Sequence, residues 1–242
     1  MKNFILLTLT LLCSTIGYNQ KLKPRMVKNY WDFNSSQIRS SNNYIIEAII
    51  KKYGGVPQQL GCIGDDKDSI LSSVKDAFIG SDIVVTTGGV SVGDFDFVKD
   101  VIVELGCEVL FKGVRIKPGQ HIMVAKRDDK FIIALPGFAY SSTVTALIYV
   151  VPLIQKLQRG EFSLTRVEAT LLEVFKKRQK KAEFTACHVT LKGGNYYVDF
   201  EGKKSGTSAI LTNMLGSTAL LVTDESESDK SIGDRVEILL LD

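Results

Sequence analysis

The sequence predicts an α/β protein with a mostly parallel sheet, followed by a small all-β domain that is a sandwich or a barrel. Two observations lead to this prediction. Up to residue 159, short apolar runs alternate with segments of helical periodicity, which is typical of βαβ units. From residue 160 on, short alternating segments are separated by turn residues, which is typical of an all-β domain. We therefore expect two domains, residues 1–159 and residues 160–242.

Composition narrows the class of protein and of partner. The chain has 242 residues, of which 45% are apolar and 24% are charged, and its formal net charge is +3. This charge is too small to predict a nucleic-acid or membrane surface, so we expect neither partner. The four cysteines lie far apart without a CxxC pair, which favours isolated thiols over a zinc site.

Residues 1–20 allow two interpretations. An apolar run from Phe4 to Cys13 is preceded by one lysine and followed by small and polar residues, as in a secretory signal peptide. A buried strand of an α/β sheet produces the same short apolar run. The run is too short to span a bilayer. On this pattern alone the signal peptide is favoured.

The first helix has clear boundaries. It begins near Ser41 and Asn42, which suit a helix N-terminus, and it ends at the glycines in positions 54 and 55. Its apolar face consists of Ile45, Ile46, Ile49, Ile50 and Tyr53. Residues 56–63 can form a strand. Asp65 and Asp66 then open a second helix, where negative charge is favourable.

The later elements follow the same alternation. The expected elements are a strand at 83–85, a helix at 97–105, a strand at 108–111, a hairpin of 122–125 with 131–135, and a helix at 141–157. In the C-terminal part the expected strands are residues 167–174, 185–191, 196–200, 219–223 and 235–241. No internal repeat or low-complexity tract interrupts them.

A glycine-rich segment between a strand and a helix is the first candidate binding site. Residues 86–96 read TTGGVSVGDFD, and their glycines and backbone amides, with the following helix N-terminus, favour a phosphate. Thr87 and Ser91 add hydroxyls. Asp94 and Asp96 would repel a bare phosphate, but they fit a divalent cation between them and the phosphates. The alternative is a glycine-rich turn with solvated aspartates.

One acidic segment and one basic segment could border the same site. The Asp65–Asp66 pair follows a strand, and ligands of open parallel sheets bind beyond the carboxyl ends of strands. Lys117, before the tight turn at Pro118 and Gly119, could place a positive charge on an oxyanion. The alternatives are an ordinary helix cap for the aspartates and a surface turn with a solvated lysine.

A second strand-to-helix junction contains Pro136 and Gly137, followed by Ser141 before the long helix. It could bind an anion at the helix N-terminus, or it could be a simple strand end and helix cap. Neither histidine lies in one of the glycine loops, and the GxSxG motif is absent. A covalent nucleophile is therefore not expected.

These segments occur together, in one order, in a known family. The segments TTGGVSVGDFD, RIKPG and LPG resemble those of the molybdopterin molybdenumtransferases and of the related gephyrin E-domain. The segments that resemble the same family elsewhere are SSQIRSSNNYIIEAIIKKYGG, GCIGDDKDSI, SGTSAILTNMLGSTALLV and IGDRVEILLL. The resemblance extends from Gln37 to Asp242. It implies a three-layer α/β/α domain followed by a β-barrel-like domain.

The resemblance also implies an activity and its residues. The family inserts molybdenum from molybdate into adenylylated molybdopterin, releases AMP and uses Mg²⁺. The resemblance assigns ligand binding to Thr87, Gly88, Gly89, Ser91, Gly93, Asp94, Lys117, Gly119, Pro136, Gly137 and Ser141. It assigns the catalytic role to Asp96, and metal binding to Asp65, Asp66 and Asp96. It further implies a cytoplasmic homodimer whose substrate comes from a molybdopterin adenylyltransferase.

Several positions depart from the family's pattern. Gln120 stands where the family has a lysine, and Phe138 and Ala139 stand where it has asparagine and proline. Residues 13–20 lack the acidic residue that follows the family's first core strand. The domains that precede the core in the family have no counterpart in this sequence. Residues 4–13 occupy the place of that first strand, so the resemblance favours a strand over a signal peptide.

Two alternatives to the transferase stay open. A molybdopterin adenylyltransferase belongs to the same superfamily but lacks the C-terminal β domain, so residues 160–242 argue against it. A non-catalytic molybdopterin-binding or scaffold protein would keep the fold and the pocket without turnover. The departures at Gln120, Phe138 and Ala139 favour this second alternative.

Overall fold

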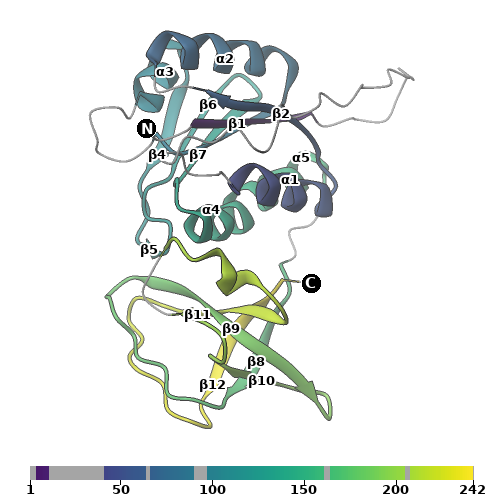
Figure 1. The fold of residues 1–242 in the computed structure, drawn as a ribbon, viewed down its shortest axis with the longest axis vertical. Helices are drawn as coiled ribbons and strands as arrows, with labels where there is room; N and C mark the ends of the chain where they lie inside the picture. The colour runs from purple at the N-terminus through teal and green to yellow at the C-terminus, as the bar shows by residue number, and fades with distance from the viewer. Residues whose placement is uncertain are drawn as a thin grey trace, which may run out of the picture.

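Two six-stranded sheets form the framework of the molecule (Figure 1). The computed structural model describes residues 4–10, 41–63, 66–89, 97–160, 164–204 and 208–241. The first sheet contains β1 (Phe4–Thr10), β2 (Val56–Ile63), β3 (Ile83–Thr87), β4 (Glu108–Lys112), β6 (Met123–Arg127) and β7 (Lys130–Leu135). The second contains β5 (Ile116–Lys117), β8 (Arg166–Leu171), β9 (Ala182–Lys192), β10 (Asn195–Asp199), β11 (Thr218–Thr223) and β12 (Arg235–Leu240). The predicted α/β class with a C-terminal β part is confirmed.

The first sheet is mixed, which corrects the prediction of a mostly parallel sheet. Its strand order is β2-β1-β3-β7-β6-β4, and only the neighbours β3 and β7 run parallel. The pairings make β2, β3 and β4 run in one direction, as their connections through helices predict. Between them lie β1 and β6, which run the opposite way. A two-residue turn forces this direction on β6, whereas no sequence signal marked the direction of β1.

Residues 4–10 form a strand between β2 and β3, which is the interpretation that the family resemblance favours. β1 pairs with both neighbours, so its backbone hydrogen-bonding groups join the interior of the sheet rather than an edge. The expected hairpin is also confirmed, because β6 and β7 pair across the turn at Asp128 and Asp129.

Helices cover both faces of the first sheet, which gives three layers (Figure 1). α2 (Lys67–Gly80) and α3 (Val98–Glu104) lie on one face, and α1 (Asn42–Lys52), α4 (Ala139–Thr145) and α5 (Val151–Leu157) lie on the other. Alternate side chains of a strand enter opposite clusters: Val84 packs under α2 and α3, whereas Ile83 packs under α1. Burial of one such side chain contributes about 1.5–3 kcal/mol.

The long helix predicted over residues 141–157 contains a π-helical turn. Between α4 and α5 lies the π-helix η1 (Ala146–Val150). Pro152 stands in the first turn of α5, where it lacks an amide hydrogen and crowds the carbonyl four residues earlier, at Ile148. A wider turn at this point accommodates the proline without ending the helix.

The second sheet closes on itself. Its order is β10-β8-β12-β11-β9-β5, and β10 also pairs with β9, so the strands from β8 to β12 form a ring. A barrel of this kind leaves few free strand edges. A buried apolar cluster that includes Leu171, Val198, Leu221 and Ile238 fills the ring. A short 3-10 helix, η2 (Leu211–Met214), precedes β11.

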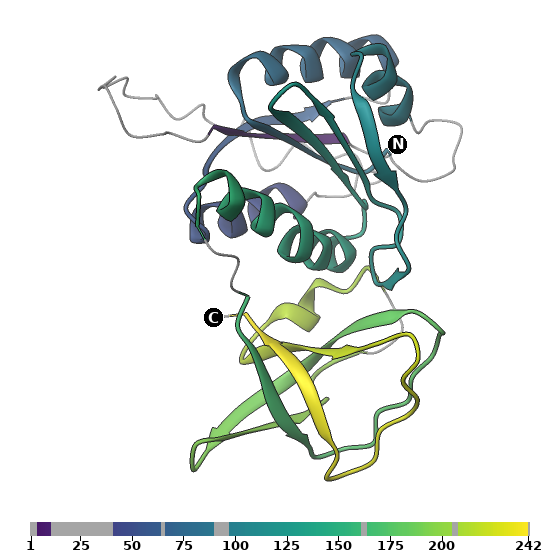
Figure 2. The same cartoon turned by 180° about the vertical axis from the view of Figure 1, so that it is seen from behind.

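The α/β part lies directly against the barrel (Figure 2), and both β5 and α4 contact the barrel. β5 leaves the α/β part and pairs in parallel with β9, so that Lys117 lies opposite Glu183. The Tyr140 hydroxyl of α4 donates to the carbonyl of Phe184 at 2.7 Å and accepts from the amide of Ala186 at 2.8 Å. An apolar cluster that includes Val144, Leu147, Leu220 and Leu239 surrounds the tyrosine.

Candidate functional site

The parallel strands β3 and β7 bring two of the predicted segments together. Thr87 at the end of β3 pairs with Leu135 at the end of β7, so both strands end at the same edge of the sheet. Gly88 and Gly89 follow one strand, and the turn at Pro136 and Gly137 follows the other. We refer to residues 87–89 with 136–137 as the glycine rim. Its position is the one at which open α/β sheets bind ligands.

Close contact between the two loops explains the glycines of the rim. The Gly88 amide donates to the carbonyl of Leu135 at 3.0 Å, and Gly88 has a φ of 87°. A β-carbon at Gly137 would lie 3.5 Å from the α-carbon of Gly88. The two backbones therefore touch, and Gly88 adopts a left-handed conformation that favours glycine.

The rim is fixed by a residue that the sequence did not identify as part of it. Asn42, in the first turn of α1, is buried, and its amide group donates to the carbonyl of Gly137 at 2.9 Å. The sequence suggested a helix-capping role for Ser41 and Asn42, but Ser41 makes no side-chain cap hydrogen bond. An asparagine next to a capping candidate carries no separate signal for a long-range contact, which is why Asn42 was missed.

Three buried hydroxyls surround the rim without partners. Within the described residues, the side-chain oxygens of Thr86, Thr87 and Ser142 are buried and make no hydrogen bond. Thr86 and Thr87 end β3, and Ser142 lies in the first turn of α4, directly beyond the rim. Buried hydroxyls are normally hydrogen-bonded, so these groups have capacity for a ligand or for water.

Asp66 has a structural role in the described part of the chain. Its carboxylate accepts a hydrogen bond from the amide of Ser69 at 2.9 Å and caps the N-terminus of α2. Hydrogen bonds from Ser69 lower the pKa of Asp66, so the group stays ionised at neutral pH. The capping alternative is therefore realised, and metal binding by Asp66 stays a prediction.

Three of the predicted residues lie across α4 from the glycine rim. They are Lys117, Gly119 and Ser141. A β-carbon at Gly119 would overlap the γ-methyl group of Thr145, and Gly119 has a φ of 103°, so its glycine serves close packing against α4. The amide of Ser141 donates to the carbonyl of Ser208 at 3.3 Å, which ties α4 to the barrel. Ser141 is buried and so contacts the interior rather than open solvent.

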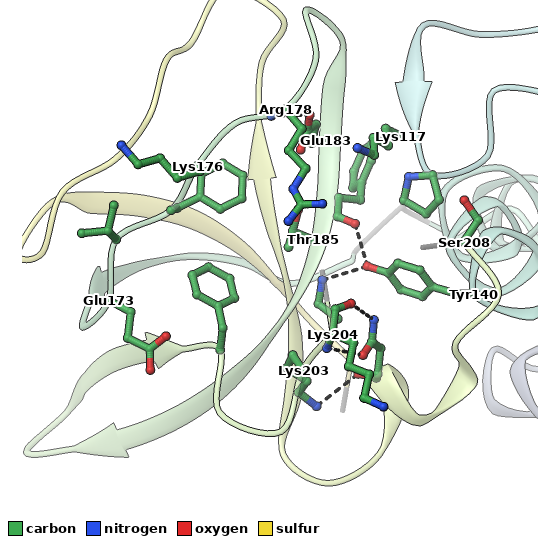
Figure 3. Close-up of a pocket in the computed structure, with 17 residues that line it drawn as sticks. Lys117, Tyr140, Glu173, Lys176, Arg178, Glu183, Thr185, Lys203, Lys204 and Ser208 are labelled. Carbon is green, nitrogen blue, oxygen red and sulfur yellow. Dashed lines mark hydrogen bonds between the residues drawn. The ribbon is translucent and has the colours of Figure 1, made fainter. Parts of the chain in front are cut away.

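A cavity of about 320 Å³ opens between β5, α4 and the barrel (Figure 3). Its charged lining consists of Lys117, Glu173, Lys176, Arg178, Glu183, Lys203 and Lys204, so basic side chains outnumber acidic ones. Lys117 makes no side-chain hydrogen bond or ion pair among the described residues. We call this space the basic cavity.

Several charges of the basic cavity are already engaged by the fold. Buried Glu183 accepts hydrogen bonds from the amides of Arg178 and Gln179, and Lys176 pairs with Asp229 at 3.0 Å. The Lys203 ammonium donates to the carbonyl of Leu215 and to two other groups, and its burial lowers its pKa. Among the described residues Lys117 makes no such contact, so its ammonium group is available to a ligand.

Most of the barrel side of this cavity escaped the sequence prediction. Residues 176–181 read KKRQKK, a basic run that could have been noticed, and Arg178 comes from it. Local sequence does not reveal that this run faces Lys117, because the pairing of β5 with β9 joins residues far apart in the chain. Tyr140 was missed for the same reason.

Some predicted residues cannot be placed. Asp65, Ser91, Gly93, Asp94 and Asp96 lie outside the described residues. Among the residues that are described, no group of three or more acidic, histidine or cysteine side chains could hold a metal ion. The predicted catalytic and metal-binding roles of Asp96 and Asp65 thus stay predictions.

No described helix is both long enough and apolar enough to cross a membrane.

Several curated proteins are similar to this chain in sequence. Relatives include the molybdopterin molybdenumtransferase of Bacillus subtilis, 31% identical over 207 residues, and that of Staphylococcus aureus, 32% identical over 206 residues. These matches cover 85% and 84% of this chain but 47% and 48% of the relatives. The chain therefore spans about half the length of the curated relatives it matches.

Solved structures share the fold. A molybdenum cofactor biosynthesis protein of Pyrococcus furiosus matches with a TM-score of 0.64 and 22% identity, over 83% of this chain and 64% of its own. The molybdopterin biosynthesis moeA protein of Pyrococcus horikoshii matches with a TM-score of 0.65 and 23% identity, over 85% of this chain and 47% of its own. The family described as "Probable molybdopterin binding domain" matches residues 19–156. The chain belongs to this molybdopterin-binding family.

Proposed function

We propose that this chain contains the ligand-binding core of a molybdopterin molybdenumtransferase, which inserts molybdenum from molybdate into adenylylated molybdopterin and releases AMP. The observation that carries the proposal is the proximity of two sites with different chemistry. The glycine rim and the basic cavity are separated only by the first turns of α4, since Gly137 precedes this helix and Tyr140 of the helix lines the cavity.

The glycine rim suits the phosphorylated pterin. The Gly88 amide is engaged by Leu135, but Gly89 leaves the backbone open to close approach, and amides in such a turn are donors for phosphate oxygens. The unpartnered hydroxyls of Thr87 and Ser142 can add hydrogen bonds. Ser91, Gly93 and Asp94 would extend the same rim, as the family resemblance implies.

The basic cavity suits molybdate, a dianion. Lys117 offers a mobile point charge, and Arg178 offers planar guanidinium donors. The family's lysine at position 120 is replaced by glutamine, but the ammonium group of Lys181 donates to the Gln120 side chain. A positive charge from the barrel therefore reaches the position where the family carries one.

The remaining predicted residues belong to the chemical step. Asp96, with Asp65 or Asp66, would hold Mg²⁺, because carboxylate oxygens are the ligands that this ion prefers. In the proposed reaction water cleaves the phosphoanhydride bond between AMP and the pterin phosphate. The two dithiolene thiols bind molybdenum, while one oxygen of molybdate leaves with their two protons as water. Asp96 would be the essential carboxylate at the phosphoanhydride bond.

AMP release tests this proposal. The protein is mixed with adenylylated molybdopterin, molybdate and Mg²⁺, and AMP is quantified by chromatography. We expect release by the parent protein and none by Asp96→Asn. Asp128→Asn is the matched control, because Asp128 lies in the β6–β7 turn with a φ of 55°, a conformation that asparagine tolerates. Normal turnover by Asp96→Asn would remove Asp96 from its role.

A non-catalytic molybdopterin-binding protein is the second candidate. Gln120 and Phe138 stand in place of the family's lysine and asparagine, and this observation favours it. Under this candidate the parent protein binds the pterin nucleotide at the glycine rim, but it releases no AMP.

The family resemblance further suggests a cytoplasmic homodimer that receives its substrate from an adenylyltransferase. Light scattering tests whether the chain forms a homodimer. A molar mass of twice 26.7 kDa would support the dimer, and a mass of one chain at all accessible concentrations would contradict it.

A further inference from the structure

Phe138 is an exposed aromatic residue at the glycine rim. It directly follows Gly137, whose backbone touches Gly88, and 63% of its surface is exposed to solvent. Large aromatic side chains normally bury most of their surface, so an exposed ring beside a ligand site invites a functional explanation.

Phenylalanine at position 138 also stabilises the N-terminus of α4 less than a capping residue would. It is the N-cap residue of α4, with a φ of −74° and a ψ of 132°, and it makes no side-chain cap hydrogen bond. Serine, threonine, asparagine or aspartate at such a position would satisfy an amide of the first turn. A phenylalanine therefore forgoes a cap and exposes apolar surface at the same residue. Departures of this kind from local rules concentrate at functional sites.

The backbone around Phe138 is held firmly. The carbonyl of Gly137 accepts from Asn42 at 2.9 Å, and the carbonyl of Phe138 accepts from the amide of Ser142 at 2.8 Å. A fixed backbone presents the ring at a defined place, so little conformational freedom is lost when a ligand packs against it.

We propose that Phe138 is a binding platform against which a planar heterocycle of the ligand stacks. The inference rests on the proposed function, in which a pterin nucleotide occupies the glycine rim. That ligand carries two planar ring systems, the pterin and the adenine, and either stacks on an aromatic face by the same physics. Phosphate binding at Gly89 and stacking at Phe138 would then orient the ligand together.

Fluorescence titration with two separate probes tests the platform. One probe is the oxidised, phosphorylated pterin derived from molybdopterin, and the other is AMP. We expect Phe138→Leu to weaken the binding of the stacked probe about tenfold and Phe138→Tyr to preserve it. The probe that responds identifies the ring that stacks.

Phe138→Asn provides a readout that a purely structural role would not give. Asparagine can cap α4, so this variant is expected to raise the melting temperature while it weakens binding of the same probe. Ile232→Asn is the matched control, because it removes an exposed apolar side chain from a turn of the barrel. We expect it to leave the affinity unchanged.

Two results would overturn the platform, and they differ in what they say about the proposed function. If Phe138→Leu and Phe138→Asn bind both probes as tightly as the parent, while Lys117→Ala loses molybdate binding, stacking fails and the proposed function stands. If the parent binds neither probe, the proposed function and the platform fail together.

Discussion

Gly119 gives the most demanding test of the structure, because the family resemblance assigned it to the ligand whereas its contacts indicate packing. In Gly119→Ala the new methyl group would overlap the γ-methyl group of Thr145. The backbone conformation at a φ of 103° adds strain for any residue with a β-carbon. Strain of about 1–2 kcal/mol and overpacking of about 1–3 kcal/mol give a predicted loss of roughly 3 kcal/mol in the free energy of unfolding.

Gly113→Ala separates the two contributions. Gly113 also has a positive φ, of 75°, but a β-carbon there would meet only the carbonyl oxygen of Gln120, at an ordinary 3.6 Å. We expect this variant to lose only the strain, about 1–2 kcal/mol. The difference between the two variants, about 2 kcal/mol, measures the contact between Gly119 and α4.

Thr145→Ser supplies the rescue. Serine keeps the hydroxyl that donates to the carbonyl of Ser141 at 2.7 Å and removes the methyl group in the way. Alone, the deletion of this buried methyl costs about 1 kcal/mol. Combined with Gly119→Ala it should be stabilising, with a coupling free energy of about 2 kcal/mol in a double-mutant cycle.

The assay is urea unfolding followed by circular dichroism, with the four variants and the parent at one protein concentration. Equal losses in Gly119→Ala and Gly113→Ala would refute the close packing. Additive effects of Gly119→Ala and Thr145→Ser would refute the proposed partner. In either case Gly119 would return to the set of candidate ligand-binding residues.

Three further predictions concern the rim, the barrel contact and α2. Asn42→Ala removes the donor to the Gly137 carbonyl and should cost about 1–2 kcal/mol in urea unfolding; an unchanged midpoint would show that the hydrogen bond contributes nothing. Burial raises the pKa of Cys187 to about 12 and also raises the pKa of Tyr140. Both groups ionise earlier in the unfolded chain, so stability should fall as the pH rises above about 9, and less steeply in Tyr140→Phe with Cys187→Ala. The urea midpoint between pH 7 and pH 11 measures this, and identical slopes in parent and variant would contradict it. Asp66→Asn keeps the cap on α2 and should leave the melting temperature unchanged; if calorimetry then finds weaker Mg²⁺ binding, Asp66 is also a ligand, and an unchanged affinity limits it to capping.

The sequence predicted the glycine rim because the signals there are local. A β-branched run followed by glycines marks the end of a buried strand, as at Thr87 and Gly88, and Pro136–Gly137 marks another. That the two junctions meet follows from the parallel pairing of β3 and β7, which the structure shows and the sequence did not predict. Helical periodicity before residue 160 and short alternating segments after it likewise predicted most of the helices and strands.

The missed features depend on contacts between residues far apart in the chain. Asn42 and Gly137 are separated by 95 positions, and the barrel wall of the basic cavity faces Lys117 only because β5 pairs with β9. The direction of β1 was missed because helix alternation constrains only the strands that a helix connects. The direction of β6 could be predicted, because the expected hairpin makes β6 run antiparallel to β7.

β5 contributes Ile116 and Lys117 to the sheet of the barrel although the chain on both sides of it belongs to the α/β part. Backbone hydrogen bonds as well as side-chain contacts therefore join the barrel to the α/β part. A cut at residue 160 would leave β9 with an open edge and the basic cavity with one wall. A C-terminal part produced alone would therefore lack the two-residue strand β5, which pairs with this end of β9.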